Sequence, residues 1–443
     1  MESITAASIK IWGDIAGYVA WEKGEPCATF EYEPKFLRNG LDLAPMTMNL
    51  RDARQGARWS FPDIDPMTFH GLPGLLASSL PDNFGNKLID SWLVRHGRDP
   101  KTFNAIERLC YIGTRGMGAL EFYPQLSSKR LDQSITVDVK ELMALVQDAL
   151  TERTRLDARI DEGTADKEKA EALLAILRVG TSAGGAVPKA IIAINDKGHV
   201  ISGQSDVPKG YEHWILKFDG ISEDKPDKFG TSFDNGRVEY AYYLMAQDAG
   251  INMMECRLLE ENGRAHFMTK RFDRVGNEKI HVLSLACMSH LGWNPAGSAG
   301  YEQAFYTMRM LRMTYAEQEQ QFRRMVFNAV SKNIDDHTKN ISYMMDKDGV
   351  WKLSPAYDLT LSFDSTELFG DQHKMTINGK QKDITIEDLL SVAKNMGIKK
   401  GSKIIEQVRD SVARWDTFAG QAGVQKDVRK HISDLHMSLK DTT

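Results

Sequence analysis

Short runs in which hydrophobic and polar residues alternate predict half-buried β-strands in two parts of the chain. These runs cover residues 8–12, 17–21, 121–123, 189–194, 213–218 and 264–271. In the first third, a turn cluster at 71–74 is followed by a helical pattern to about residue 96. We therefore expect a first region of mixed α and β structure and a second αβ region that begins near residue 189.

Helical periodicity dominates the remaining segments. Hydrophobic residues recur at helical spacing between 137 and 178 and between 238 and 250, where Gly250 ends the pattern as glycine often ends helices. Residues 151–170 are densely charged with both signs, which is typical of a solvated helix face or loop. We place a domain boundary or an exposed insertion there.

One hairpin interrupts the mostly helical C-terminal third. Residues 341–345 and 350–353 predict two strands, and the Asp-Lys-Asp-Gly sequence between them predicts the turn. A helical pattern precedes the hairpin and leads into residues 333–340, which read Asn-Ile-Asp-Asp-His-Thr-Lys-Asn. Directly after the second strand comes Asp358.

The order of a helix, Asp-x-x-x-x-Asn, a hairpin and a further Asp is that of a protein-kinase catalytic centre. Asp335 fits the base that accepts the proton of an attacking hydroxyl group. Asn340 and Asp358 carry hard oxygen ligands of the kind that Mg²⁺ prefers. Taken alone, the same run also fits a polar loop that caps a hairpin, and His337 fits a structural hydrogen bond as well as a ligand or base.

An upstream Lys and a Gly-rich loop supply the other half of such a centre. Lys217 ends a predicted strand and Glu239 lies early in the next helix, so the two residues are candidates for a phosphate-holding Lys and its partner. Residues 180–189 form a loop of small residues whose backbone N–H groups can approach phosphate oxygens. The loop is not a Walker A motif, and the absence of His-Arg-Asp and Asp-Phe-Gly excludes an ordinary eukaryotic-type kinase.

Composition and charge narrow the class of protein. The 443 residues allow two or three cooperating domains, and 42% hydrophobic with 26% charged residues is typical of a globular protein. A net charge of −5 gives no global reason for direct binding to nucleic acid. Four scattered cysteines without a Cys-x-x-Cys pair argue against a zinc site or a disulfide framework, so we expect buried thiols. Without a signal-peptide pattern or a membrane-length apolar run, we expect a soluble cytoplasmic protein.

Several motifs, in order, resemble the HipA family of bacterial type II toxin–antitoxin Ser/Thr kinases. The segments that carry the resemblance are residues 71–75, 79–82, 115–120, 180–189, 215–217, 270–274, 335–340 and 355–358. The family implies an α+β, two-lobed protein-kinase-like fold. Residues 1–130 would form an N-terminal mixed α/β subdomain, residues 131–275 the kinase N-lobe-like region, and residues 276–443 an all-helical C-terminal lobe with the catalytic and Mg-binding residues.

Carried over by position, the resemblance implies a role for each site residue. Asp335 would be the catalytic base, and Asn340 and Asp358 would bind Mg²⁺. The residues implied to contact ATP are Gly184, Gly185, Ala186, Val187, Pro188, Lys189, Lys217, Lys270, Arg271, Phe272, His337, Lys339, Asn340, Tyr357 and Asp358. Among these, Lys270 to Phe272 would form the hinge that meets adenine.

Ser182 occupies the position of a Ser whose autophosphorylation ejects the phosphate loop and silences family kinases. A phosphate there would add nearly two negative charges beside those of ATP. A Ser in a Gly-rich turn is also expected without any such role. Two departures concern ATP contacts, since Pro188 lacks a backbone N–H and Lys270 stands where the best-known relative has an acidic residue.

The resemblance also implies partners. They are a small helix-turn-helix antitoxin of the HipB type, operator DNA reached indirectly through that antitoxin, and a protein substrate, for which the family's characterised targets suggest an aminoacyl-tRNA synthetase. No membrane partner is expected. The residues leave two alternatives open, which are a small-molecule or lipid kinase of the same fold and a non-catalytic regulatory subunit that works with the antitoxin or DNA.

Overall fold

The computed structural model describes residues 3–95, 97–126, 136–140, 142–143, 188–219, 234–261, 263–293, 295–362 and 370–436. The charged segment 151–170 and most of the predicted helix over 137–178 therefore lie outside the described residues. The same holds for Ser182 and for the predicted phosphate-loop residues Gly184, Gly185, Ala186 and Val187.

An antiparallel sheet of order β3-β2-β1-β4 forms the N-terminal part of the molecule. Its strands are β1 (Ala6–Ile11), β2 (Asp14–Ala20), β3 (Thr29–Tyr32) and β4 (Leu120–Tyr123). Three of them confirm predicted strands, because alternate side chains such as Ile9 and Ile11 turn inward and are buried. The helical segments around the sheet are η1 (Phe36–Arg38), α1 (Leu50–Ala53), α2 (Pro66–Phe69), α3 (Gly74–Ala77), α4 (Asn83–Arg95), η2 (Pro100–Thr102) and α5 (Ala105–Ile112).

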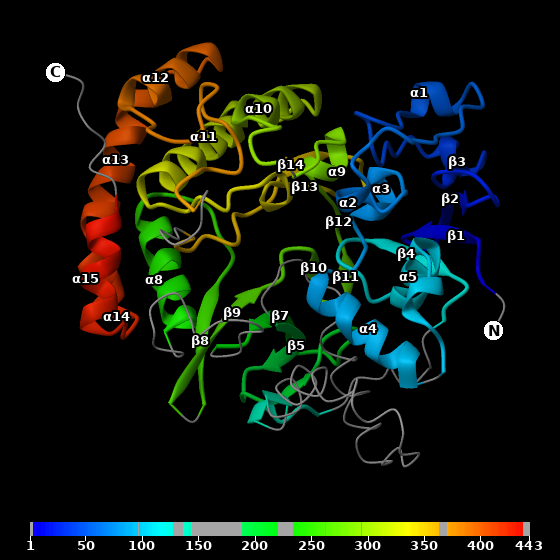
Figure 1. The fold of residues 1–443 in the computed structure, drawn as a ribbon, viewed down its shortest axis with the longest axis horizontal. Helices are drawn as coiled ribbons and strands as arrows, with labels where there is room; N and C mark the ends of the chain where they lie inside the picture. Colours follow the sequence, from blue (N-terminus) through cyan, green and yellow to red (C-terminus); the bar gives the residue numbers. More distant parts are fainter. Residues whose placement is uncertain are drawn as a thin grey trace.

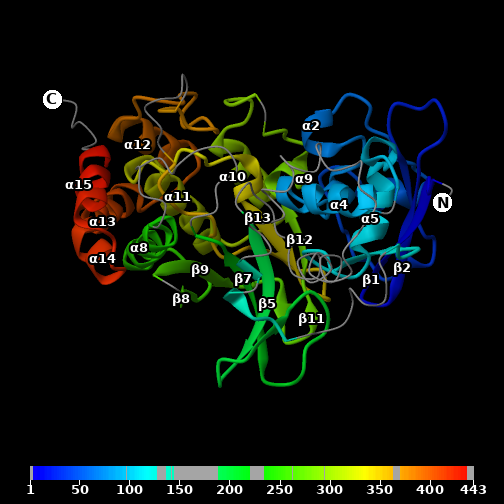
Figure 2. The ribbon, with the colours of Figure 1, turned by 60° about the horizontal axis from the view of Figure 1, so that its bottom comes forward.

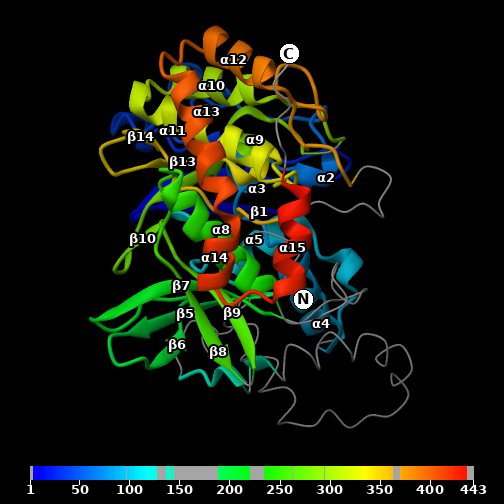
Figure 3. The same cartoon turned by 90° about the vertical axis from the view of Figure 1, so that its left-hand side faces the viewer.

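A second antiparallel sheet, of order β6-β5-β7-β9-β8, occupies the middle of the chain. Its strands are β5 (Lys189–Asn195), β6 (Val200–Ser202), β7 (Tyr211–Lys217), β8 (Cys256–Glu261) and β9 (Arg264–Lys270). Figure 3 shows α8 (Asn235–Asp248) between this sheet and the helices of the C-terminal part. On the other face, side chains of α4 pack with Trp214 and Leu216 of β7. The predicted strands and the predicted helix in this region are confirmed.

The C-terminal part is mostly helical and also contains a small sheet of order β12-β13-β14. The predicted hairpin is confirmed as β13 (Ser342–Met345) and β14 (Trp351–Leu353), and β12 (His281–Ser284) pairs with it from outside the predicted segments. The remaining elements are β10 (Arg274–Val275), β11 (Glu278–Lys279), α9 (Leu285–Ser289), α10 (Tyr301–Met310), α11 (Tyr315–Val330), η3 (Thr338–Asn340), α12 (Ile386–Asn395), α13 (Gly401–Ala413), α14 (Trp415–Gln421) and α15 (Lys426–Leu435).

The N-terminal sheet and helices α12 to α15 lie at opposite ends of the molecule (Figures 1 and 2). One large cluster of buried hydrophobic side chains nevertheless runs from β1 through α8 to α11 and α13. All four cysteines are buried and free, as expected. Among the helices of the described part of the chain, none is both long and apolar enough to span a membrane.

Candidate active site

Lys217 lies where three separate elements meet. Its Nζ donates to Glu239 Oε1 at 2.5 Å and also to Asp358 Oδ1. Lys217 ends β7, Glu239 lies in α8, and Asp358 follows β14. Burial opposes the charge of Lys217, but the carboxylates of Asp358 and Glu239 outweigh it and raise the pKa of the ammonium group. The structure therefore joins the predicted Lys–Glu pair to the Asp beyond the hairpin.

The two carboxyl groups that bond to Lys217, those of Asp358 and Glu239, have pKa values shifted in opposite directions. Burial disfavours the charge of Asp358, yet Lys217 and Lys189 outweigh this and hold its pKa below the usual range. Burial raises the pKa of Glu239, although Lys217 opposes the shift. Asp358 has a φ of 58°, an uncommon backbone conformation for a non-glycine residue. Such a conformation persists where surrounding contacts hold it, and the bond to Lys217 is one such contact. Together with His337, Asn340 and Tyr357, Asp358 lines a pocket, which is the cleft of this site.

The local packing of α8 explains how Glu239 reaches Lys217. Gly236 lies in the first turn of α8, where an added Cβ would lie only 1.9 Å from the carbonyl oxygen of Ala265 in β9. Glycine therefore lets the helix approach the sheet closely. Because Glu239 is three residues further along the same helix, this approach brings its carboxylate to β7.

Lys189 stands directly opposite Lys217 in the pairing of β5 with β7. Side chains of directly opposed residues project from the same face of a sheet. Lys189 is only 4% exposed, and burial lowers its pKa, as does the nearby Lys217, while Asp358 raises it. Two ammonium groups on one face suit a polyanion such as a triphosphate.

The loop after α11 presents Asp335 to solvent while its backbone is held on both sides. The Asp335 amide donates to Ser362 Oγ at 2.8 Å, and the Asp335 carbonyl oxygen accepts from Asn340 Nδ2 at 3.0 Å. Partial desolvation raises the pKa of Asp335, and the nearby charge of Asp358 adds to the rise, whereas His337 and Lys374 oppose it. A base with a raised pKa in a cleft is typical of a catalytic position.

The three predicted hinge residues have different surroundings. The Lys270 ammonium group bonds to Glu212, and the ring of Phe272 lies 5.7 Å from the ring of Tyr357. The guanidinium group of Arg271 is buried and pairs with Asp273 at 2.7 Å, so its side chain belongs to the interior of the hinge. The Arg271 amide also donates to the His213 carbonyl oxygen at 2.9 Å, which leaves the Arg271 carbonyl oxygen as its group for contact with a nucleotide.

The residues around Asn340 form a connected rim of the cleft. The Tyr357 hydroxyl donates to the Lys339 carbonyl oxygen at 2.6 Å and lies 2.6 Å from Ser342 Oγ. The Lys339 ammonium group lies 5.7 Å from the centre of the Trp293 ring. His337 also faces Trp293, and its buried Nδ1 has no hydrogen-bond partner among the described residues.

Of the predicted phosphate loop, Pro188 and Lys189 are described, and the Pro188 carbonyl oxygen accepts from the Phe218 amide at 3.0 Å.

A buried polar network lies behind Asp335, and no motif or spacing in the sequence predicts it. Asp336 Oδ2 accepts from the Tyr301 hydroxyl at 2.8 Å and from His373 Nδ1 at 2.7 Å. Asp336 Oδ1 accepts from the Lys374 amide at 2.8 Å. From the sequence, only Asp336 could have been found, through its position next to Asp335. The other members of the network come from distant parts of the chain.

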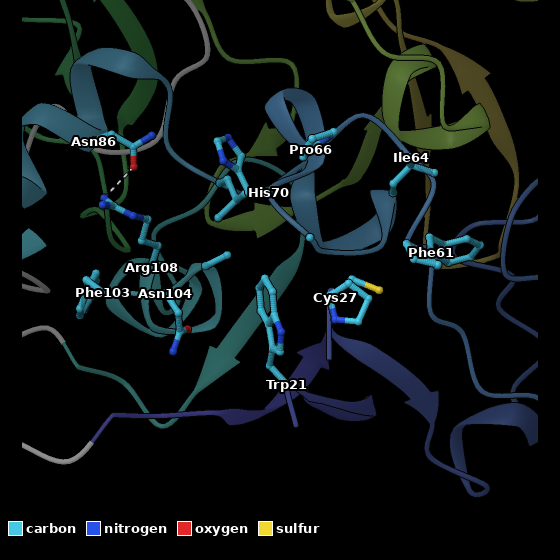
Figure 4. A pocket seen from close by; sticks show the side chains of 15 residues that line it. Trp21, Cys27, Phe61, Ile64, Pro66, His70, Asn86, Phe103, Asn104 and Arg108 are labelled. Atoms are coloured by element: carbon cyan, nitrogen blue, oxygen red, sulfur yellow. Dashed lines mark hydrogen bonds between the residues drawn. The ribbon is translucent and has the colours of Figure 1, made fainter. Parts of the chain in front are cut away.

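A separate pocket of about 470 Å³ lies in the N-terminal part of the molecule (Figure 4). Its walls include Trp21, His70 and Phe61, and Arg108 is held there by a bond to Asn86 Oδ1 at 2.9 Å. All its lining residues fall between positions 21 and 108. It is therefore distinct from the cleft around Lys217.

Comparisons with known proteins cover both halves of the chain. Residues 7–123 match the family model of the HipA N-terminal domain, and residues 181–415 match that of the HipA-like C-terminal domain. The structure is similar to a chain of the Shewanella oneidensis MR-1 toxin–antitoxin complex of HipA, HipB and operator DNA. That match has a TM-score of 0.62 and 16% identity and covers 97% of this chain and 94% of the other.

A much weaker similarity is to the proinflammatory kinase CtkA of Helicobacter pylori, with a TM-score of 0.29, 13% identity, and coverage of 51% of this chain and 92% of the other. The family assignment rests on the two domain models, which together account for most of the sequence. The chain belongs to the HipA family and has its two-lobed, protein-kinase-like fold.

Proposed function

We propose that the chain is a Mg-ATP-dependent kinase that phosphorylates Ser or Thr in a protein. The observation that carries this proposal is the bridge from Lys217 to both Glu239 and Asp358. A Lys on a strand, its Glu on a helix and an Asp beyond the hairpin are the parts that a kinase needs around ATP phosphates and metal. An ion pair with a purely structural role needs only Lys217 and Glu239, whereas here Asp358, from beyond the hairpin, is a third partner.

The described residues fit Mg²⁺. Asn340 donates through Nδ2 to the Asp335 carbonyl oxygen, so its Oδ1 is the amide atom left for a cation. Asp358 stays ionised because its pKa is held low, which suits a hard divalent ion. We assign both residues to the metal, which neutralises charge on the ATP oxygens. Mg²⁺ commonly uses only one or two protein side chains together with substrate phosphates.

In the proposed reaction, Asp335 accepts the proton of the substrate hydroxyl group. The hydroxyl oxygen bonds to the γ-phosphorus while the bond to the β-phosphate oxygen breaks, which gives a phosphoprotein and ADP. We assign Lys217, Lys189, Pro188 and residues 184–187 to the phosphates. Lys270 to Phe272 are assigned to the adenine side, and His337, Lys339 and Tyr357 to the walls of the nucleotide site.

The remaining assignments follow from membership of the family. We propose a HipB-like helix-turn-helix antitoxin as partner, contact with DNA through that antitoxin, and an aminoacyl-tRNA synthetase as candidate substrate, all in the cytoplasm. Silencing by autophosphorylation at Ser182 is part of the proposal. So is the division into an N-terminal subdomain (1–130), an N-lobe-like region (131–275) and a C-terminal lobe (276–443).

The test compares the wild-type protein with Asp335→Asn and Asp358→Asn for transfer of labelled phosphate from Mg-ATP to proteins of a cell lysate. For Asp335→Asn we expect transfer to fall by roughly 10²- to 10⁴-fold, the usual contribution of a general base. Asp358→Asn should also lower transfer, because it removes a proposed ligand of the metal. Asp416→Asn is the control, because Asp416 has an 83% exposed side chain in α14. Intact-mass measurement of the same samples checks for phosphate on Ser182.

Three outcomes would contradict parts of the proposal. Wild-type transfer by both variants means that the site is assigned wrongly. Label in no protein band, with ATP consumed, favours a small-molecule kinase. Nucleotide binding without any consumption favours a non-catalytic subunit.

A further inference from the structure

We propose that Asp336 is a positioning residue that fixes the geometry of the neighbouring Asp335. This inference deepens the proposed function and rests on it. The two residues are adjacent but face opposite ways, since Asp335 is exposed at the cleft while the Asp336 side chain is 1% exposed. Asp336 therefore cannot act on a substrate directly.

The Asp336 carboxylate joins three segments of the C-terminal lobe. Tyr301 comes from the start of α10, while His373 and the Lys374 amide come from the chain beyond the hairpin. A buried carboxylate is stable only when such donors satisfy it, and bonds to an ionised acceptor are stronger than neutral ones. The Lys374 amide also donates to the Ile334 carbonyl oxygen at 3.1 Å, so this segment is fastened to both sides of Asp335.

The same network continues to Asn333, two residues before Asp335. The Tyr301 hydroxyl accepts from Asn328 Nδ2 at 2.9 Å, and Asn333 Nδ2 donates to Asn328 Oδ1 at 3.0 Å. Asn333 Oδ1 in turn accepts from Ser362 Oγ at 3.3 Å, the atom that also holds the Asp335 amide. The backbone of Asp335 is thus held by Ser362 on one side and by the neighbouring Asp336 on the other. Tyr301 links these two residues, because it bonds to Asp336 directly and to Ser362 through Asn328 and Asn333.

This arrangement matters for catalysis because a general base works only within hydrogen-bond reach of the proton it accepts. A displacement of about 1 Å can cost on the order of 10²-fold in rate. Asp336→Asn keeps the size of the side chain but replaces one acceptor oxygen with a donor that faces other donors. The Asp335 carboxylate should then shift, while Lys189 of β5, Lys217 of β7 and residues 270–272, which lie on other elements of the proposed nucleotide site, stay in place.

The test measures phosphoryl transfer by Asp336→Asn and Tyr301→Phe. We expect kcat of Asp336→Asn to fall by roughly 10- to 100-fold, the size typical of lost outer-shell support, with the KM for ATP within about threefold of wild type. Tyr301→Phe should fall less, because His373 and Lys374 still hold the carboxylate. Hydrogen exchange at the Asp335 and Lys374 amides should be faster in Asp336→Asn.

The matched control is Asp388→Asn. Asp388 is also a buried carboxylate, and it accepts from Asn378, Lys380 and the Thr385 amide at the start of α12. This control should lose stability and keep wild-type kcat. An unchanged kcat in Asp336→Asn, or an equal fall in Asp388→Asn, overturns the inference. If the wild-type protein transfers no phosphate, the proposed function fails, and unchanged exchange at the Asp335 amide then overturns the positioning role by itself.

Discussion

At the residue scale, the two lysines that face each other across β5 and β7 differ in how directly their charges are compensated. Lys217 is paired with Glu239 and Asp358, whereas no hydrogen bond or ion pair of the Lys189 ammonium group is found among the described residues. A buried ammonium group beside another cation destabilises the nucleotide-free protein. We therefore attribute Lys189 to the proposed binding of phosphates rather than to folding.

We predict that Lys189→Met stabilises the nucleotide-free protein and weakens ATP binding. Removal of the buried charge should raise the free energy of unfolding by about 1 kcal/mol, and loss of a phosphate contact should raise the KM for ATP several-fold. Thermal unfolding of the nucleotide-free protein measures the first effect, and the rate of phosphoryl transfer at varied ATP concentration measures the second. A lower melting temperature together with unchanged affinity would show that Lys189 is structural.

The sequence predicted those site residues whose types and spacing are tied to chemistry. Lys217, Asp335, Asn340 and Asp358 carry such spacing. In the structure Lys217 bonds to Asp358, Asn340 bonds to the Asp335 backbone, and Asn340 and Asp358 line the same pocket. Tyr301 and its network partners could not be predicted, because single polar residues are common everywhere and only folding brings these together. Their roles appear once hydrogen bonds between distant segments are known.

At the element scale, hydrophobic periodicity located β5, β7, β9 and α8 within a few residues. It missed β12, because a short strand that pairs only with a distant partner has too few positions to show a period. It also gave no reason for Gly236, since close approach of a helix to a sheet leaves no periodic pattern.

We predict that Gly236→Ala lowers both stability and activity. The new Cβ would meet the Ala265 carbonyl oxygen, so α8 must move away from β9 and carry Glu239 away from Lys217. The melting temperature and kcat/KM for ATP should both fall. Gly420→Ala in α14 is the control, because its Cβ would meet only the end of the flexible Arg429 side chain, and alanine favours a helix by up to about 1 kcal/mol. Equal behaviour of the two variants would refute the role of Gly236.

At the scale of the whole molecule, one hydrophobic core joins the N-terminal sheet to the helical lobe, and a buried ion cluster joins the loop before β4 to the segment after β9. Asp273 accepts from Arg271 and Arg274 and from the Gly118 amide, while Arg274 also donates to the Gly116 carbonyl oxygen. Burial opposes the charge of Asp273, but the two arginines outweigh it and hold its pKa well below the usual range. The domain boundaries inferred from the sequence therefore do not separate the hydrophobic core, because one cluster of buried side chains extends across them.

We predict that Asp273→Asn lowers the free energy of unfolding by about 3 to 5 kcal/mol at pH 7, because two buried guanidinium groups lose their partner. Because the pKa of Asp273 is depressed in the folded protein, its carboxylate stabilises the fold above about pH 4, the pKa of an unfolded Asp. This stabilisation is lost as the pH falls toward the folded-state pKa. The difference between variant and wild type should therefore shrink in strong acid. Urea unfolding, followed by tryptophan fluorescence and circular dichroism, should show one transition for both proteins, and two separate transitions would contradict a shared core.

The contact between Lys217 and Asp358 has a thermodynamic consequence for the order of binding. In the proposed enzyme, Asp358 must exchange an ammonium group for a divalent ion, and Lys217 must exchange a carboxylate for phosphate oxygens. Either exchange breaks the contact between Lys217 and Asp358, which otherwise competes with the second ligand. Metal and nucleotide should therefore bind with positive cooperativity. Reciprocity then requires ATP to tighten the metal by the same factor by which the metal tightens ATP. In the proposed enzyme, the affinity for Mg²⁺ would then stay low until the triphosphate arrives.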